Sequence, residues 1–170
     1  MNTDVLGWLI SRVTLKPLTE MLSVRIWSRI GMEQDAFMSV DSIVTPFAGG
    51  GLNAGLRDMA RFGQMFLDEG QFNGEQMIPL SAIRSTREGG NKDAFAAAGY
   101  ETLTGWSYRS MWWLTHNEHG AFMGRGVHGQ SLYIDPTAHM VIARFASNPL
   151  AGNVKKIRLR CRPIMPWRNA

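Results

Sequence analysis

The chain has 170 residues, of which 45% are hydrophobic and 19% charged, and this composition indicates one globular domain and excludes a disordered chain. No apolar run approaches the roughly 18 residues of a membrane-spanning helix, and the single cysteine, Cys161, excludes a disulfide framework or a cysteine-rich zinc site. The net charge of +4 arises from the basic residues 151–170, while the rest is slightly acidic, so we do not expect nucleic-acid binding as the main function.

Two helices are predicted at the start of the chain. Met1 to Asp4 lacks the basic start of a signal peptide, and we place the chain in the cytoplasm by default. Apolar residues at helical spacing predict a first helix over 4–13. Pro17 suits the first helical position and Gly31 a left-handed cap, so a second helix is expected over 18–30.

The middle of the chain predicts two more helices. Residues 32–48 look irregular, and Asn53 is a candidate cap for a helix over 54–69 that ends at Gly70. Residues 72–75 read Phe-Asn-Gly-Glu and predict a tight turn. Pro79 opens a short helix over 79–86.

Strand-like segments follow Gly99. The aromatic segment 106–114, a short stretch at 121–123, and the segments 131–135 and 139–146 predict three or four antiparallel strands between 105 and 147. Helices followed by an antiparallel meander indicate an α+β fold over residues 1–152. Residues 153–170 lose the apolar periodicity and are expected to form an irregular basic tail.

These segments resemble the C-terminal half of the β-lactamase-related serine hydrolases, the superfamily with the penicillin-binding protein and class C β-lactamase fold. They are most similar to its branch of 6-aminohexanoate-dimer hydrolases and carboxylesterase-like proteins. The resemblance rests on the order and spacing of motifs that are individually weak: Asn2-Thr3-Asp4-Val5-Leu6-Gly7-Trp8, Ile26-Trp27, Ile30-Gly31-Met32, Gly50-Gly51-Leu52-Asn53-Ala54, Arg57-Asp58-Met59-Ala60-Arg61-Phe62-Gly63, Gly126-Val127-His128-Gly129-Gln130 and Tyr133-Ile134-Asp135-Pro136.

The resemblance implies three motifs around a nucleophilic serine. No serine of the chain is followed three residues later by lysine, so the Ser-x-x-Lys pair that holds the nucleophile is absent. The family's tyrosine element would precede Met1, and we attribute Tyr108-Arg109-Ser110 to chance. The third motif corresponds to His128, Gly129 and Gln130, which would form the cleft wall. The N–H of Gly129 or Gln130 would then be an oxyanion donor. The alternative is a histidine at the start of a strand that is bonded to a neighbour.

Other candidate site residues have simpler interpretations. His116 and His119 flank a predicted hairpin loop, where a solvated turn is favoured over a metal site, and His139 is expected to be exposed. The aromatic residues Trp106, Tyr108, Trp112 and Trp113 could line a cleft, although sheet packing against helices is favoured. We predict no metal ion or cofactor.

The chain also departs from the family pattern. Leu15 stands where relatives usually have a glycine, and leucine in a left-handed conformation costs on the order of 1 kcal/mol or more. The basic tail does not resemble the family's C-terminal helix, and we expect a truncated gene remnant with a replaced end. An exposed apolar face is predicted from Trp106, Trp112, Leu132, Ile134, Ile142 and Phe145, together with self-association through an unpaired sheet edge.

Three functional hypotheses follow. The first is a serine hydrolase for a small amide or ester substrate, to which this chain contributes the cleft wall. The second is a remnant without catalytic activity, and the third is an interaction module whose basic tail binds an acidic partner. Because the nucleophile and the base are missing, we expect no turnover by the chain alone.

Overall fold

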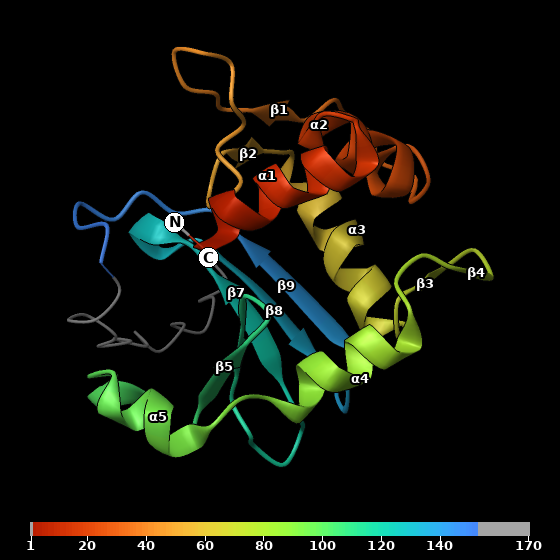
Figure 1. Ribbon diagram of the computed structural model, residues 1–170. Helices are drawn as coiled ribbons and strands as arrows, with labels where there is room; N and C mark the ends of the chain where they lie inside the picture. The colour runs from red at the N-terminus through yellow and green to blue at the C-terminus, as the bar shows by residue number, and fades with distance from the viewer. Residues whose placement is uncertain (1, 153–170) are drawn as a thin grey trace, which may run out of the picture.

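The computed structural model describes residues 2–152, and in them helices precede an antiparallel sheet, which confirms the predicted α+β class (Figure 1). The predicted basic tail lies outside the described residues. No helix in the described part is both long and apolar enough to cross a membrane. The elements in chain order are α1 (Asn2–Thr14), α2 (Leu18–Leu22), the π-helical turn η1 (Ser23–Trp27), β1 (Phe37–Met38), β2 (Leu52–Asn53), α3 (Leu56–Leu67), β3 (Gln71–Phe72), β4 (Glu75–Gln76), α4 (Leu80–Glu88), α5 (Lys92–Ala97), η2 (Glu101–Leu103), β5 (Ser107–Arg109), β6 (Trp112–Leu114), β7 (Phe122–Arg125), η3 (Val127–Gly129), β8 (Ser131–Asp135) and β9 (Met140–Arg144).

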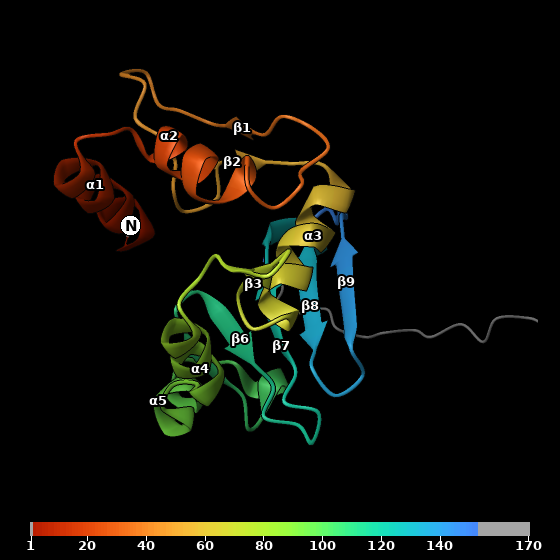
Figure 2. The same cartoon turned by 90° about the vertical axis from the view of Figure 1, so that its right-hand side faces the viewer.

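The first helices and the β1–β2 ribbon form a layer beyond one end of the sheet (Figure 2). Leu15 links α1 to α2 with a φ of 56°, and Gly31 follows the second helical segment with a φ of 67°, as the sequence predicts for both positions. The predicted single helix over 18–30 is divided, because α2 widens into η1 after Leu22. Gly7 packs so tightly on Ala48 that a Cβ there would lie 2.8 Å from the Ala48 Cβ.

Helix α3 joins this layer to the sheet. The buried carboxylate of Asp58 accepts the backbone N–H groups of Glu33 at 2.8 Å and Gln34 at 3.2 Å, which fixes the chain after η1. The prediction that Asn53 caps this helix is wrong, because α3 begins at Leu56 after Gly55, and Asn53 lies in β2. The Asn53 side chain instead donates to the Gly51 carbonyl oxygen at 2.8 Å.

The large sheet has five strands in the order β5-β6-β7-β8-β9, one more than the upper predicted number, and all neighbours are antiparallel. The extra strand arises because segment 106–114 is a hairpin and not one strand. Ser110 and Met111 have φ angles of 49° and 70°, the left-handed pair that closes a tight two-residue turn. The Asn73-Gly74 turn between β3 and β4 has the same character and confirms the prediction of a turn at 72–75.

One face of the sheet is covered by α3, and this contact forms the core. Gly63 lies directly against β8 and β9, where a Cβ would be 2.6 Å from Val141 Cγ1 and 2.9 Å from Leu132 Cδ1. The core under and beside α3 combines one residue that follows η1 with residues of α3, α4 and the sheet: Ile30, Met65, Phe66, Ile83, Trp112, Leu114, Phe122, Leu132 and Ile134.

The predicted exposed apolar face is therefore wrong for half of its members. Trp112, Leu132 and Ile134 are buried in the core, with exposed fractions of 9%, 5% and 0%. Ile142 and Phe145 are exposed, as expected. The physical reason is strand register. Ile134 pairs with Val141 and faces α3, whereas Ile142 pairs with Tyr133 and faces the opposite side.

Candidate functional site

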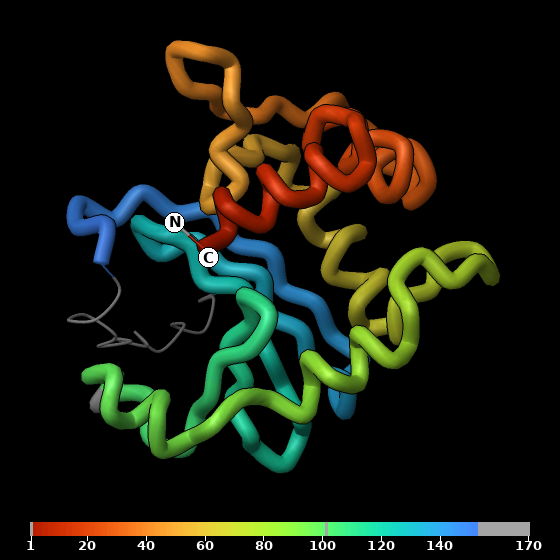
Figure 3. Tube along the Cα trace, viewed as in Figure 1, coloured from red at the N-terminus to blue at the C-terminus, as the bar shows by residue number. Residues whose placement is uncertain are grey.

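The predicted cleft-wall residues form a tight turn between β7 and β8. The turn is closed by the Gly126 N–H, which donates to the Gln130 carbonyl oxygen at 2.9 Å. Inside it, His128 has a φ of 58° and Gly129 a φ of 88°. Two successive left-handed residues explain the glycine, and a Cβ at Gly129 would lie 2.4 Å from Asn148 Nδ2. Figure 3 shows the tube reversing direction here, at the end of the sheet nearer α1.

The segment after β9 holds His128 in place. The Asn148 N–H donates to the His128 carbonyl oxygen at 3.0 Å, and the His128 N–H donates to the Ala151 carbonyl oxygen at 3.2 Å. His128 Nδ1 lies 2.7 Å from the Asn148 carbonyl oxygen. A carbonyl oxygen can only accept, so Nδ1 carries the proton and Nε2 of the neutral ring is left as an acceptor. The bonded-histidine interpretation thus holds for one ring nitrogen, and the other keeps the ability to bind a ligand group.

The two candidate oxyanion donors lie at the end of this turn. The Gln130 N–H donates to the Val127 carbonyl oxygen at 3.3 Å, a bond within the 3₁₀ turn. In this conformation the Gln130 amide is used within the turn, and the turn would have to open before that N–H could bind an oxyanion. The role of Gly129 and Gln130 as oxyanion donors stays a prediction.

His116 is exposed and His119 is partly buried in the loop between β6 and β7, and each has a hydrogen-bond partner. Ser107 Oγ accepts the Gly90 N–H at 3.0 Å and lies 2.7 Å from His116 Nε2, within hydrogen-bond distance. Ser107 is fully buried, and burial together with Lys92 lowers the pKa of His116. Sequence reasoning missed Ser107, since no local spacing connects it with Gly90 or His116.

His119 is held by the carboxylate of Asp135, which lies 2.9 Å from its Nδ1. Asp135 is buried and also accepts the Ala138 N–H at 2.9 Å and the Tyr133 hydroxyl at 3.2 Å. These bonds, the Ala138 N–H first, lower the pKa of Asp135. The described residues contain no group of three potential metal ligands.

The aromatic segment packs on both faces of the sheet, and the neighbouring residues Trp112 and Trp113 lie on opposite faces. Trp112 packs in the core against Phe66, with ring centres 4.6 Å apart. Trp113 points to the opposite face and meets Tyr100 edge-on at 5.0 Å and Tyr108 at 5.2 Å. Helix α5, which was not predicted, places Phe95 5.6 Å from Trp113. The signal for this helix was Asn91, whose side chain caps it by accepting the Ala94 N–H at 2.8 Å.

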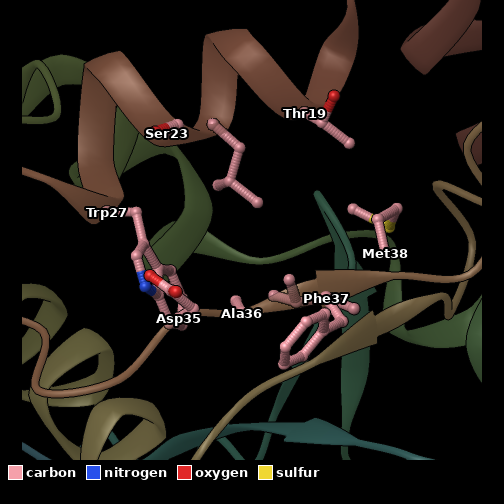
Figure 4. Close-up of a pocket in the computed structure, with 9 residues that line it drawn as sticks. Thr19, Ser23, Trp27, Asp35, Ala36, Phe37 and Met38 are labelled. Carbon is pink, nitrogen blue, oxygen red and sulfur yellow. The ribbon is translucent and has the colours of Figure 1, made fainter.

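A separate hollow of about 270 Å³ lies between the helical layer and β1. In Figure 4, Thr19 and Ser23 line its helical side, whereas Phe37 and Met38 line its strand side. Asp35 is the titratable residue among its lining residues, and Trp27 donates its indole N–H to the Gln34 carbonyl oxygen at 2.9 Å. His128 is not among the residues that line this hollow.

Comparison with known proteins identifies the family. Residues 1–158 match the family model described as Beta-lactamase. The chain is 38% identical over 149 residues to a 6-aminohexanoate-dimer hydrolase from Paenarthrobacter ureafaciens, which covers 87% of this chain and 38% of that protein. A solved structure from Bacillus anthracis, assigned as a 6-aminohexanoate-dimer hydrolase, is 44% identical with a TM-score of 0.78, covering 88% of this chain and 38% of that one.

A Bacteroides dorei structure assigned as a β-lactamase shares the fold, with 16% identity, a TM-score of 0.60, and coverage of 82% of this chain and 47% of the other. The chain therefore spans less than half the length of each of these relatives. The predicted resemblance to the β-lactamase-related serine hydrolases is confirmed, and the chain belongs to the β-lactamase family.

Proposed function

We propose that this chain forms one wall of the active site of a serine hydrolase that cleaves an amide or ester of a small acyl compound. Membership of the family and the names of the two 6-aminohexanoate-dimer hydrolases support the reaction class. The observation that carries the proposal is the turn at His128, which Asn148 fixes through the His128 backbone and through Nδ1 of its ring.

In the proposed reaction, a serine hydroxyl attacks the substrate carbonyl carbon and loses its proton to a base. The leaving amine or alcohol takes a proton, and water then hydrolyses the acyl-enzyme to a carboxylic acid and regenerates the serine. No serine in the printed sequence belongs to a Ser-x-x-Lys pair. We therefore expect the nucleophile and the base of the proposed reaction to come from residues other than those in this sequence.

In the proposed reaction, this chain helps to position the substrate. The turn after β7 holds His128 in one orientation, because Nδ1 of its ring donates to the Asn148 carbonyl oxygen at 2.7 Å.

A chimera tests this proposal. Residues 2–152 of this chain would replace the aligned part of the Bacillus anthracis protein, to which the chain is 44% identical. We expect the chimera to hydrolyse p-nitrophenyl acetate or a short linear amide, and His128→Ala to lower kcat/KM by at least about tenfold. The matched control is His139→Ala, because His139 is exposed in the turn before β9.

Two results would contradict the proposal. One is a folded chimera without turnover, which would favour a remnant without catalytic activity. The other is an equal effect of the His128 and His139 substitutions. The unmodified chain is the baseline, and we expect it to show no turnover above background, because the residual acceleration without a nucleophile is small.

A further inference from the structure

The hollow between the helical layer and β1 has a negative charge in its wall that no cation neutralises. Asp35 is the charged residue among those that line it. Arg57 and Arg61 form ion pairs with Glu33, and Arg25 on η1 forms none with Asp35. In the part of the chain that the structure describes, the ion-paired carboxylates are others: Glu20, Glu33, Asp58, Glu69, Glu75, Glu88 and Asp135.

Two aromatic side chains, Trp27 and Phe37, line the same hollow. The Trp27 indole N–H donates to the Gln34 carbonyl oxygen at 2.9 Å, which holds the ring next to the backbone that carries Asp35. Phe37 on β1 is 71% exposed. Among residues 2–152, contacts of rings with rings or cations engage other aromatic residues: Trp8, Phe62, Phe66, Phe95, Tyr100, Trp106, Tyr108, Trp112, Trp113 and Phe122. Both rings therefore keep the capacity to attract a cation to their negative faces.

The size and the lining of the hollow suit a small ligand with an apolar body. Its volume of about 270 Å³ lies just below the about 300–1,000 Å³ of pockets for drug-sized ligands. Figure 4 shows Trp27 and Asp35 toward one end and Thr19 and Met38 toward the other. A ligand that fills this space meets one carboxylate and a largely apolar surface.

A metal ion does not match this lining. Ca²⁺ and Mg²⁺ take about six or more oxygen ligands, whereas the side chains here offer one carboxylate and the hydroxyl groups of Thr19 and Ser23. The described residues also contain no group of three potential metal ligands. The uncompensated charge and the two rings instead favour a cation whose surface is itself apolar.

We propose that this hollow binds a small quaternary ammonium compound of the choline class, with its charge near Asp35 and its methyl groups against Trp27 and Phe37. A quaternary ammonium has no N–H donor that needs an acceptor, and aromatic rings are the usual protein partners of such a group. The carboxylate adds a Coulombic attraction that a neutral molecule of the same shape lacks. His128 does not line this hollow, so the site is independent of the proposed hydrolase function.

The test measures binding to the intact chain. Titration calorimetry would compare choline with 3,3-dimethylbutan-1-ol, which has the same shape but carbon in place of the charged nitrogen. We expect choline to bind at least about tenfold more tightly, with a preference that weakens as sodium chloride is added. Choline should also shift the indole N–H signal of Trp27 in nuclear magnetic resonance spectra of the ¹⁵N-labelled chain. Trp27→Phe would assign that signal by its loss.

Two substitutions separate the contributions of charge and ring. Asp35→Asn should remove most of the preference for choline, because the amide keeps the shape of the side chain and loses its charge. Its matched control is Asp93→Asn, since Asp93 is exposed on α5, at the other end of the molecule in Figure 1. Phe37→Leu should weaken choline binding by at least about threefold. Its control is Phe145→Leu, at an exposed position after β9.

Near-ultraviolet circular dichroism would verify that each variant is folded, so that lost binding reflects the altered side chain. Four results would overturn the inference. These are no saturable binding of choline, equal binding of choline and its neutral analogue, an unchanged preference in Asp35→Asn, and an equal loss in Asp93→Asn. Saturable binding of choline that leaves the Trp27 signal in place would also contradict it, because the cation would then be bound elsewhere.

Discussion

Replacing Gly63 with alanine tests the contact that joins α3 to the sheet. The added Cβ would lie 2.6 Å from Val141 Cγ1 and 2.9 Å from Leu132 Cδ1, whereas carbon atoms in contact are normally about 3.5–4.0 Å apart. Leu132 can give way at the end of its side chain. Val141 cannot do so easily, because its branched Cβ restricts χ1 and its Cγ1 moves with the backbone of β9.

Two effects oppose each other in this substitution. Overpacking of a core costs about 1–3 kcal/mol, whereas alanine favours a helix over glycine by about 1 kcal/mol. With both neighbours closer than 3.0 Å, we place the cost near the upper end of its range and expect Gly63→Ala to lower the free energy of unfolding by about 1–2 kcal/mol. Urea denaturation would measure the change as a lower midpoint with the same slope.

Two further variants make the test specific. Gln64→Ala, at the exposed next position of α3, should change stability by less than about 0.5 kcal/mol. Val141→Ala removes the atom in closest contact, so the double variant with Gly63→Ala should be more stable than the sum of the single effects predicts. Unchanged or increased stability of Gly63→Ala, or strictly additive effects, would refute the packing argument.

Three more expectations concern stability and association. Leu15→Gly should raise the free energy of unfolding by about 1 kcal/mol, because Leu15 has a φ of 56° that strains a leucine backbone. The control Val13→Gly, inside α1, should lower the free energy of unfolding by about 1 kcal/mol. If urea denaturation shows that Leu15→Gly is not more stable than Val13→Gly, the strain at Leu15 is disproved. The pKa of Asp135 is below 3.8, first because of the Ala138 N–H and then His119, so its stabilisation is present above pH 3.8 and lost on acidification. Urea midpoints of Asp135→Asn and the unmodified chain should therefore differ near neutral pH and converge in acid, and a constant gap would contradict this. The β9 edge and the exposed apolar residues of α1 predict self-association, which a concentration-independent monomer in sedimentation velocity would exclude.

The sequence by itself determined the features that depend on neighbouring residues. The period-two pattern before and after the turn at 135–138 predicts β8 and β9, and Asn73-Gly74 predicts the turn between β3 and β4. The left-handed positions Leu15 and Gly31 were also predicted correctly, the first through the family resemblance and the second through helix-capping chemistry. These features need little information from distant parts of the chain, because backbone sterics and side-chain periodicity are local.

The tertiary structure alone decided which face each strand buries and which distant groups meet. Segment 106–114 looks like one aromatic strand in the sequence, but in the structure it forms the hairpin of β5 and β6. Because β6 pairs with β7 below α3, Trp112 lies in the core and Trp113 faces the opposite side of the sheet. The candidate site shows the same dependence. The proton position on His128 follows from the carbonyl oxygen of Asn148, twenty residues away. Hydrogen bonds of this kind depend on distances of a few ångströms, and a linear pattern contains no such distances.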